Sequence, residues 1–179
     1  MAAPGGLLIS APPLGDPNFS RTVVLMCQHD EDGSLGLVIN RVGPVDVAEV
    51  LRRLDITAAE PHPEPTLWGG PVGEGNGFVI WRGRAGDDEG WNVGPELAVS
   101  PSADRLSRLA GGGQPFALVL GYAGWSPGQL DGEIEAGAWL YTDADPAIVL
   151  DLPLDERYRA ALAALGLSPD SFWAGPADA

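Results

Sequence analysis

One stretch near residue 120 specifies its local structure more clearly than any other part of the chain. Residues 116–120 form an apolar run of strand length, bounded by a proline and a glycine. Ser126 and Gln129 follow with the Ser-x-x-Gln spacing of a capping box, in which polar side chains pair with otherwise unbonded amides at a helix start. Pro127 suits the first position of such a helix. The stretch therefore predicts a strand, a turn over 121–125 and a helix.

Short apolar runs separated by turn-rich segments occur on both sides of this stretch. With 179 residues, the chain has the length of one domain, which we place at residues 1–179. Strands and helices do not alternate strictly, so we expect an α+β fold: a complex single domain with a mixed, largely antiparallel sheet surrounded by about four helices. The expected strands cover 6–10, 22–27, 35–40, 67–72, 78–81, 97–99, 116–120, 138–142 and 148–150, and the expected helices begin near Asp46, Ser102, Ser126 and Leu154.

Charge and composition exclude several classes of protein. The formal net charge is −15, whereas a nucleic-acid surface needs a basic patch, so we expect no nucleic-acid partner. All ten basic residues are arginine, which removes Schiff-base, Walker-A and Ser–Lys chemistry. A single cysteine fits a reducing compartment, and no apolar run approaches the roughly 18 residues of a membrane span. We therefore expect a cytoplasmic protein without a signal peptide or membrane segment.

The candidates for catalysis and metal binding each have a simpler explanation. Cys27 and His29 lie two residues apart in a predicted strand and share a face, but a cysteine in an apolar strand is typical of a small core residue. The only other histidine, His62, stands between two prolines, and the acidic run at 30–32 lacks the spacing of a calcium loop. The serines fall at turns and helix caps, without a Gly-x-Ser-x-Gly motif. We expect no catalytic set, metal or cofactor, and the Cys–His pair stays an alternative.

Polar and aromatic side chains at the ends of the predicted elements define one candidate pocket. Arg21 and Arg41 offer forked donors for a carboxylate or phosphate. Gln129 and Glu133 are four residues apart and share a helix face. The alternative is that these groups satisfy one another and hold the loops in place. The proposed pocket consists of Asp16, Asn18, Arg21, His29, Asn40, Arg41, Gly70, Tyr122, Trp125, Gln129 and Glu133.

Four blocks of sequence, taken together, resemble the YqgE/AlgH family of bacterial proteins, which is also called UPF0301 or DUF179. The blocks are GLLISAP at 6–12 with DPNFSRTV at 16–23, His29 and Gly33 with GLVINR at 36–41, GGPV at 69–72, and GYAGWSPGQL at 121–130 with Glu133 and the Trp-Leu pair at 139–140. They come in the order of the family and span nearly the whole chain.

The resemblance implies a cytosolic α+β protein of one domain whose sheet is partly closed into a barrel and surrounded by helices. It implies no settled activity. Some members carry the label of a putative transcriptional regulator, but this chain has no usual helix-turn-helix pattern.

Two positions depart from the family: Val42 stands where a proline is usual, and Trp81 stands where the family often has histidine. A site that needs a histidine at Trp81 therefore does not transfer to this chain.

Three functions follow from these observations. The leading hypothesis is a non-catalytic binding or regulatory protein whose partner is a small molecule or a protein, with an unspecified oligomeric state. The first alternative is a hydrolase-type enzyme that uses His29 with Asp16 or Glu133, and it requires a hydrogen bond between the two groups at a cleft. The second alternative is a DNA-associated transcriptional regulator, which the net charge of −15 disfavours.

Overall fold

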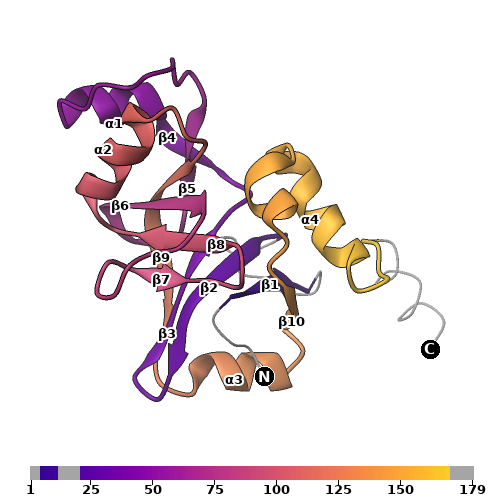
Figure 1. The fold of residues 1–179 in the computed structure, drawn as a ribbon. Coiled ribbons are helices and arrows are strands. Elements are labelled where there is room, and N and C mark those ends of the chain that lie inside the picture. The colour runs from indigo at the N-terminus through magenta and orange to yellow at the C-terminus, as the bar shows by residue number, and fades with distance from the viewer. Residues whose placement is uncertain (1–4, 12–20, 170–179) are drawn as a thin grey trace.

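The protein is described by a computed structural model that covers residues 5–11 and 21–169 (Figure 1). Asp16 and Asn18 of the predicted pocket lie outside the described residues. The elements are, in chain order, β1 Gly6–Ser10, β2 Val23–Asp30, β3 Gly33–Val38, β4 Val42–Asp46, α1 Val47–Arg53, β5 Pro65–Trp68, β6 Val72–Arg82, β7 Trp91–Asn92, β8 Leu97–Ser100, α2 Ala103–Gly111, β9 Ala117–Trp125, α3 Gln129–Glu135, β10 Trp139–Asp143, the π-helix η1 Ala147–Asp151, and α4 Leu154–Ala163.

The strands form one mixed, largely antiparallel sheet, which confirms the predicted α+β class. Its main path runs β10-β1-β2-β3-β9-β6-β8-β7, and the single parallel pair among the described strands joins β5 to β9. The expected partial closure into a barrel is not found, because the end strands β7 and β10 do not pair with each other in this part of the chain. The sheet instead divides at β9, whose first half pairs with β5 and β6 and whose last residues pair with β3.

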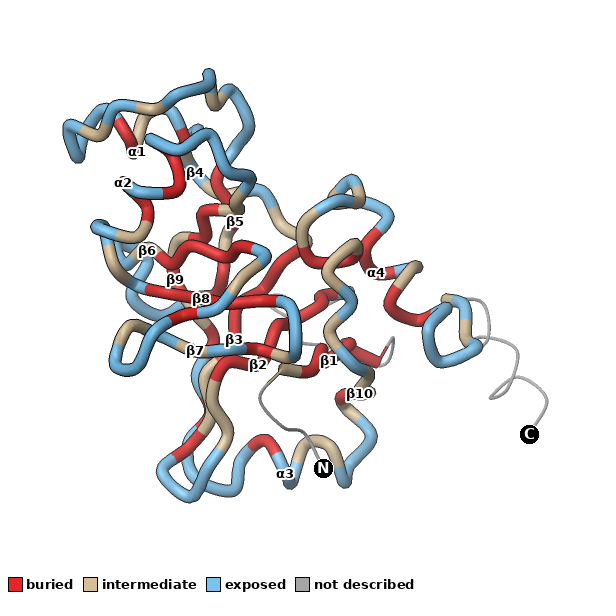
Figure 2. Tube along the Cα trace, viewed as in Figure 1, coloured by how far each residue is buried: buried red, intermediate tan, exposed pale blue. Residues whose placement is uncertain are grey.

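Helices cover the two wings of this divided sheet. Strands β1 and β2 are buried along most of their length because both of their faces are covered, which explains their unbroken apolar runs (Figure 2). Residues of η1 and α4 pack on one face, and α3 packs with the rings of Trp125 and Trp139 on the other. In the other wing, α1 and α2 cover β6, β8 and the start of β9. None of the helices in the described residues combines the length and apolarity needed to cross a membrane.

Local structure departs from the predictions at two places. Residues 121–125 continue strand β9 instead of turning, because Gly121 accommodates an irregularity in the pairing with β6 at a φ of +80°. Helix α3 then begins at Gln129, although one half of the predicted capping box is present: the Gln129 Oε1 atom accepts the backbone N–H of Ser126 at 3.0 Å. Residues 148–150, expected as a strand, belong instead to the π-helix η1.

A buried arginine explains why η1 is stable. Arg157 of α4 is 6% exposed. Its guanidinium donates to the carbonyls of Leu152, Ile39 and Val149 at 2.9, 2.8 and 2.7 Å. Burial lowers the pKa of Arg157 to about 10, which leaves the group charged at neutral pH. One side chain therefore joins α4, η1 and the end of β3 by satisfying carbonyls that the π-helix and the strand leave unpaired.

We expect Arg157→Met to lower the free energy of unfolding by about 3 kcal/mol or more, because it leaves several buried carbonyls without a donor. Arg159→Met is the matched control, because Arg159 lies on the same helix and is exposed. Urea denaturation followed by circular dichroism measures both. Equal losses for the two variants would contradict the role assigned to Arg157.

Candidate functional site

The first predicted pocket residues lie where β2 begins and β3 ends. Asn40 accepts the backbone N–H of Val23 through Oδ1 and donates to the carbonyl of Arg21 through Nδ2, both at 3.0 Å. The guanidinium of Arg21 lies 5.1 Å from the ring centroid of Tyr158. Both polar atoms of the Asn40 side chain are therefore hydrogen-bonded to backbone, and they hold the segment before β2 against the end of β3.

A second group lies at the opposite end of these strands, beside α3. The carboxylate of Glu133 accepts both indole N–H groups of Trp125 and Trp139 on Oε1, at 3.1 and 2.9 Å, and the amide of Gln129 on Oε2 at 3.0 Å. The two indole rings meet edge to face at 6.0 Å. Trp125 is 6% exposed, so its ring belongs to the core and does not wall an open pocket.

A third group lies between these two, next to β9. Gly70 approaches the backbone of β9 so closely that a Cβ atom there would lie 2.2 Å from the carbonyl carbon of Tyr122. Tyr122 meets Phe78 edge to face at 6.1 Å, and Arg41 stacks over Trp68 at 5.4 Å. These contacts give Gly70 and Tyr122 a packing role.

The predicted residues therefore do not assemble one pocket in the described part of the chain. Arg21 precedes β2, whereas His29 lies near the far end of that strand, and the six residue steps from Val23 to His29 correspond to about 20 Å at 3.3 Å per residue. Residues at element ends share a site only where those ends meet, which the sequence does not specify, so a ligand-binding role for these residues stays a prediction. Antiparallel pairing of β2 with β3 places their ends in two separate groups.

We expect Trp125→Ala to cost about 3–5 kcal/mol of stability, because it removes a buried ring and leaves a cavity. Trp68→Ala is a useful comparison, since the ring of Trp68 is only half-buried and should cost less. Thermal melting of both variants tests this. If Trp125→Ala loses no more stability than Trp68→Ala, the indole of Trp125 does not make the expected contribution to core packing.

A cavity of about 460 Å³ lies elsewhere, over β6 and β9 and between α1 and α2. Its wall is mostly apolar, with Phe78 and Leu118 among its buried members. Among the described lining residues, Arg53 and Glu74 are the charged ones. The lining consists of Pro44, Val45, Val50, Arg53, Leu54, Glu74, Gly75, Gly77, Phe78, Val79, Ser100, Pro101, Ser102, Ala103, Leu106, Leu118 and Leu120.

Missing side chains help to leave this space open. Gly75 has no heavy atom within 4 Å of the place where a Cβ would stand. A Cβ at Gly77 would lie 3.6 Å from the Leu120 Cδ2 atom and 3.8 Å from the Leu118 Cδ1 atom. The glycine-rich run at 73–77 is the sequence signal that could have located the cavity, because glycine within a strand often marks a place where something approaches closely.

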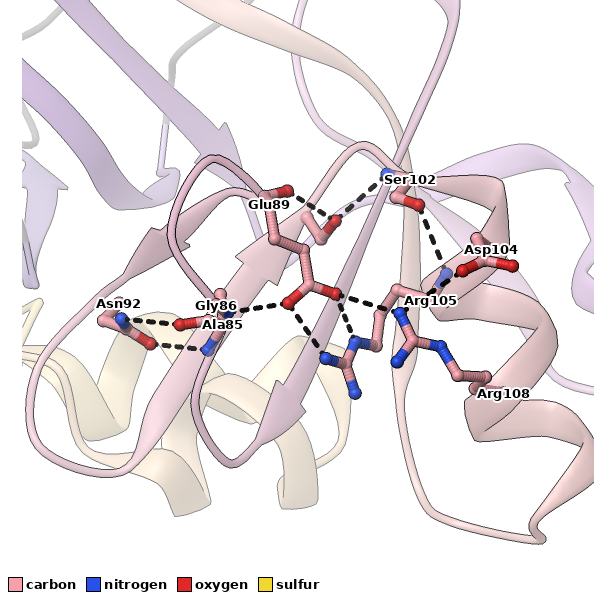
Figure 3. Close-up of polar contacts among 9 residues, drawn as sticks. Ala85, Gly86, Glu89, Asn92, Ser102, Asp104, Arg105 and Arg108 are labelled. Carbon is pink, nitrogen blue, oxygen red and sulfur yellow. Dashed lines mark hydrogen bonds and ion pairs between the residues drawn. The ribbon is translucent and has the colours of Figure 1, made fainter.

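An ion-pair network fixes the rim of the cavity at the start of α2 (Figure 3). Arg105 donates to Glu89 from Nε and Nη2 at 2.6 and 2.9 Å, and Arg108 approaches the same carboxylate at 3.6 Å. The backbone N–H of Gly86 also donates to Glu89, at 2.7 Å. Ser102, which lines the cavity, caps α2 by accepting the N–H of Arg105 at 3.3 Å, as the sequence predicted. The loop before β7 is thereby attached to the helix that borders the cavity.

Because of this network, the free energy of unfolding depends on pH at acidic values. The hydrogen bond from Arg105, followed by that from the Gly86 amide, lowers the pKa of Glu89 from an ordinary value of 4.5 to about 2. A lowered pKa in the folded state means that the unfolded chain binds the proton first. The stabilisation is therefore complete above pH 4.5 and is lost as the pH falls from 4.5 towards 2.

We expect Glu89→Gln to lower the melting temperature at pH 7, and the gap from the wild type to shrink as the pH falls below 4.5. Glu60→Gln controls for the loss of one negative charge, because Glu60 is exposed and makes no hydrogen bond or ion pair with another residue of the described chain. Melting curves at pH 7, 4.5 and 3 provide the test. A gap that stays constant across this range would contradict the role of the Glu89 carboxylate.

His29 lies between a hydroxyl and a carboxylate at the tip of the β2–β3 hairpin. Its Nδ1 atom is 2.5 Å from Ser34 Oγ and its Nε2 atom is 3.1 Å from Asp131 Oδ1. The carboxylate partner of His29 is therefore Asp131 and not Glu133, which binds the two indoles instead. Cys27 is 1% exposed, and burial raises the pKa of its thiol far above the ordinary value, so it cannot act with His29 as a nucleophilic pair.

The described residues contain no group of three or more histidine, cysteine, aspartate or glutamate side chains placed to hold a metal ion. His29, Ser34 and Asp131 do not line the cavity over β6 and β9. That cavity therefore lies away from these three side chains.

Fold and site together define a class: an α+β protein with an open, divided sheet and an apolar cavity between two short helices. The sequence model of the AlgH-like family, DUF179, matches residues 7–170. A UPF0301 protein of Ralstonia nicotianae is 44% identical over 90% of this chain and 87% of its own length, and one of Vibrio cholerae is 36% identical over 90% and 91%. The chain belongs to the AlgH-like UPF0301 family.

Two solved structures support this assignment at the level of the fold. The solution structure of AlgH from Pseudomonas aeruginosa has a TM-score of 0.76 and 39% identity, over 97% of this chain and 96% of that one. A protein from Corynebacterium diphtheriae has a TM-score of 0.73 at 23% identity, over 90% and 86%, and this likeness concerns the fold alone.

Proposed function

We propose that this protein is a non-catalytic binding protein that takes a small, mainly apolar molecule into the cavity between α1 and α2. The observation that carries the proposal is the cavity itself, whose volume of about 460 Å³ lies in the range of small-molecule sites. A cytoplasmic location and a single domain over 1–179 remain part of the proposal.

The lining chemistry supports binding over catalysis. Burying apolar side chains such as Val79, Leu106 and Leu118 against a ligand would gain roughly 25 cal/mol for each Å² of apolar surface removed from water. The described lining contains no histidine or cysteine, and its two serines use their hydroxyls elsewhere: Ser100 donates to the carbonyl of Glu89, and Ser102 caps α2.

Filling the cavity tests the proposal. Gly77→Leu adds a side chain beside Leu118 and Leu120, at a position with an ordinary φ, and is expected to abolish binding of an apolar fluorescent probe such as 1-anilinonaphthalene. Gly132→Leu is the matched control, because it adds the same side chain to α3, where no heavy atom lies within 4 Å of the new Cβ.

Probe titrations of the wild type and both variants give the answer. Binding by the wild type and by Gly132→Leu, with loss in Gly77→Leu, supports the cavity as the site. Equal binding by all three proteins, or no binding by the wild type, would contradict it.

A second candidate function, a serine hydrolase, is favoured by the contacts of His29. The Ser34–His29–Asp131 chain has the residue types of a catalytic triad, with side chains within or close to hydrogen-bond reach. The side chain of His29 is 10% exposed and that of Asp131 is 52% exposed. In this mechanism Ser34 Oγ attacks an ester carbonyl while its proton passes to His29 Nδ1, and the protonated ring gives that proton to the alkoxide that leaves as the acyl C–O bond breaks. Water, deprotonated by His29, then hydrolyses the acyl-Ser34 ester, releases the acid and restores the serine hydroxyl.

Covalent labelling separates the two candidates. If Ser34 is a nucleophile, a fluorophosphonate probe labels the wild type and Ser126→Ala but not Ser34→Ala. Absence of labelling in the wild type removes the hydrolase candidate and leaves the cavity proposal untouched.

A DNA-associated role receives no support from the placement of the arginines. Acidic partners hold Arg52 and Arg53 on α1, Arg82 on β6, and Arg105 and Arg108 on α2. Arg157 is buried. With these charges neutralised or enclosed on a chain of net charge −15, the basic surface that duplex binding needs is not assembled by the described residues.

A further inference from the structure

We infer that the ligand of the α1–α2 cavity is a short apolar peptide, one residue of which exchanges two backbone hydrogen bonds with Gly77 of β6. The inference rests on the proposed function and adds the chemical class of the ligand. It follows from three observations: the direction of the Gly77 backbone, the end of β8 beside it, and the cavity on the face where its side chain would be.

The backbone N–H and C=O of Gly77 point away from β9. Gly77 lies opposite Leu120 of β9, but the carbonyl of Leu120 accepts the N–H of Gly69 at 2.8 Å, on the side of β5. Gly77 and Leu120 are therefore a pair without mutual hydrogen bonds, because such pairs alternate with bonded pairs along antiparallel strands. The N–H of Gly83, an even number of residues further along, donates to the carbonyl of Glu96 at 3.0 Å, just before β8. The polar groups of Gly77 thus face the side of β8.

Strand β8 ends before it could pair with Gly77. Its last residue in register with β6 is Ser100, opposite Val79, so Ser102 would be the next residue to hydrogen-bond to this edge. The N–H of Ser102 donates instead to Ser100 Oγ at 3.1 Å, and its carbonyl accepts the N–H of Leu106 in α2 at 3.2 Å. The described chain therefore leaves Gly77 without a partner strand on this side, where it lines the cavity.

A half-buried N–H and C=O favour a ligand that offers both an acceptor and a donor. An unpaired backbone polar group that is removed from water costs free energy, so a purely apolar molecule would cover Gly77 without satisfying it. One residue of an extended peptide presents its own C=O and N–H on one side. It can exchange both hydrogen bonds with Gly77, as a residue of an added strand does.

The same pairing directs the side chain of the bound residue into the cavity. Residues directly opposite each other in an antiparallel pair project their side chains to the same face of the sheet. A Cβ at Gly77 would lie 3.6 Å from the Leu120 Cδ2 atom and 3.8 Å from the Leu118 Cδ1 atom, and both leucines line the cavity. The peptide residue opposite Gly77 therefore meets an apolar wall, beside a position where glycine leaves room.

N-Acetyl-leucine N-methylamide is a small probe with this chemistry. Its depsipeptide analogue, in which an ester oxygen replaces the leucine N–H, is the matched control. The methyl resonances of Leu118 and Leu120 report binding at this site by NMR titration. We expect the wild type to bind the amide about tenfold more tightly than the ester, because the ester cannot donate to the Gly77 carbonyl. Equal affinities would overturn the inference.

Gly77→Pro tests the other hydrogen bond, because proline has no N–H for the ligand carbonyl to accept. The N–H of Gly77 faces the open edge, so the substitution removes no hydrogen bond to β9. Gly77→Ala is the matched control, because it keeps the N–H at a position where φ is not positive and adds a Cβ in ordinary contact with Leu120. We expect Gly77→Pro to bind the amide probe about tenfold more weakly than Gly77→Ala.

Equal binding of the amide probe by Gly77→Pro and Gly77→Ala would contradict the assigned pairing. Circular dichroism establishes that Gly77→Pro is folded, and if it is not, the comparison of amide and ester in the wild type decides the question.

Binding of 1-anilinonaphthalene distinguishes failure of the inference from failure of the proposed function. If this probe binds the wild type but not Gly77→Leu, while amide and ester bind the wild type equally, the cavity takes apolar molecules but the assigned class is wrong. If neither 1-anilinonaphthalene nor the amide probe binds the wild type, both proposals fail.

Discussion

The arrangement of this protein depends on how strand β9 shares its hydrogen bonds. Its first residues pair with β5 and β6, and its last three pair with β3. The change of partner needs close backbone contact at Gly70 and Gly121: a Cβ at Gly121 would lie 2.6 Å from the carbonyl oxygen of Gly70, and a Cβ at Gly70 would overlap the backbone of Tyr122. Glycine is required at both positions, because each also has a positive φ. Without this crossing the sheet could not divide into two wings.

The division of the sheet also determines where a ligand can enter. One wing is covered closely on both faces. Its buried polar groups hydrogen-bond to backbone, as Asn40 after β3 and Arg157 of α4 do. In the other wing, the pairing of β6 with β9 is irregular between Val72 and Gly77, and the glycines of that segment carry no side chain to fill the space beneath α1 and α2. The cavity is therefore a consequence of the same irregular pairing that Gly121 permits.

Sequence patterns predicted the helices and strands better than they predicted which candidate site residues lie together. Apolar runs located most strands because burial on one or both faces leaves a local trace, and Ser102 identified the start of α2. The run at 148–150 was misread because a short apolar segment has no period of its own, and what makes it a π-helix is Arg157, a residue of the following helix. The grouping of the candidate site residues is hard to predict for a related reason, because residues such as Arg21 and His29 acquire neighbours only through strand order, which composition and spacing do not specify.

The stretch from Gly121 to Gln129 shows how a strong sequence pattern can point to architecture instead of chemistry. Trp125 and Gln129 of this stretch combine with Trp139 and Glu133 into a clamp, in which one carboxylate receives two indole N–H groups and an amide. That clamp fixes α3 against the sheet and uses polar atoms that a ligand would otherwise need. A carboxylate that is already saturated by partners offers little to a bound molecule. The mostly apolar cavity over β6 and β9 has no comparable clamp, which is the physical reason to look for ligand binding there and not at α3.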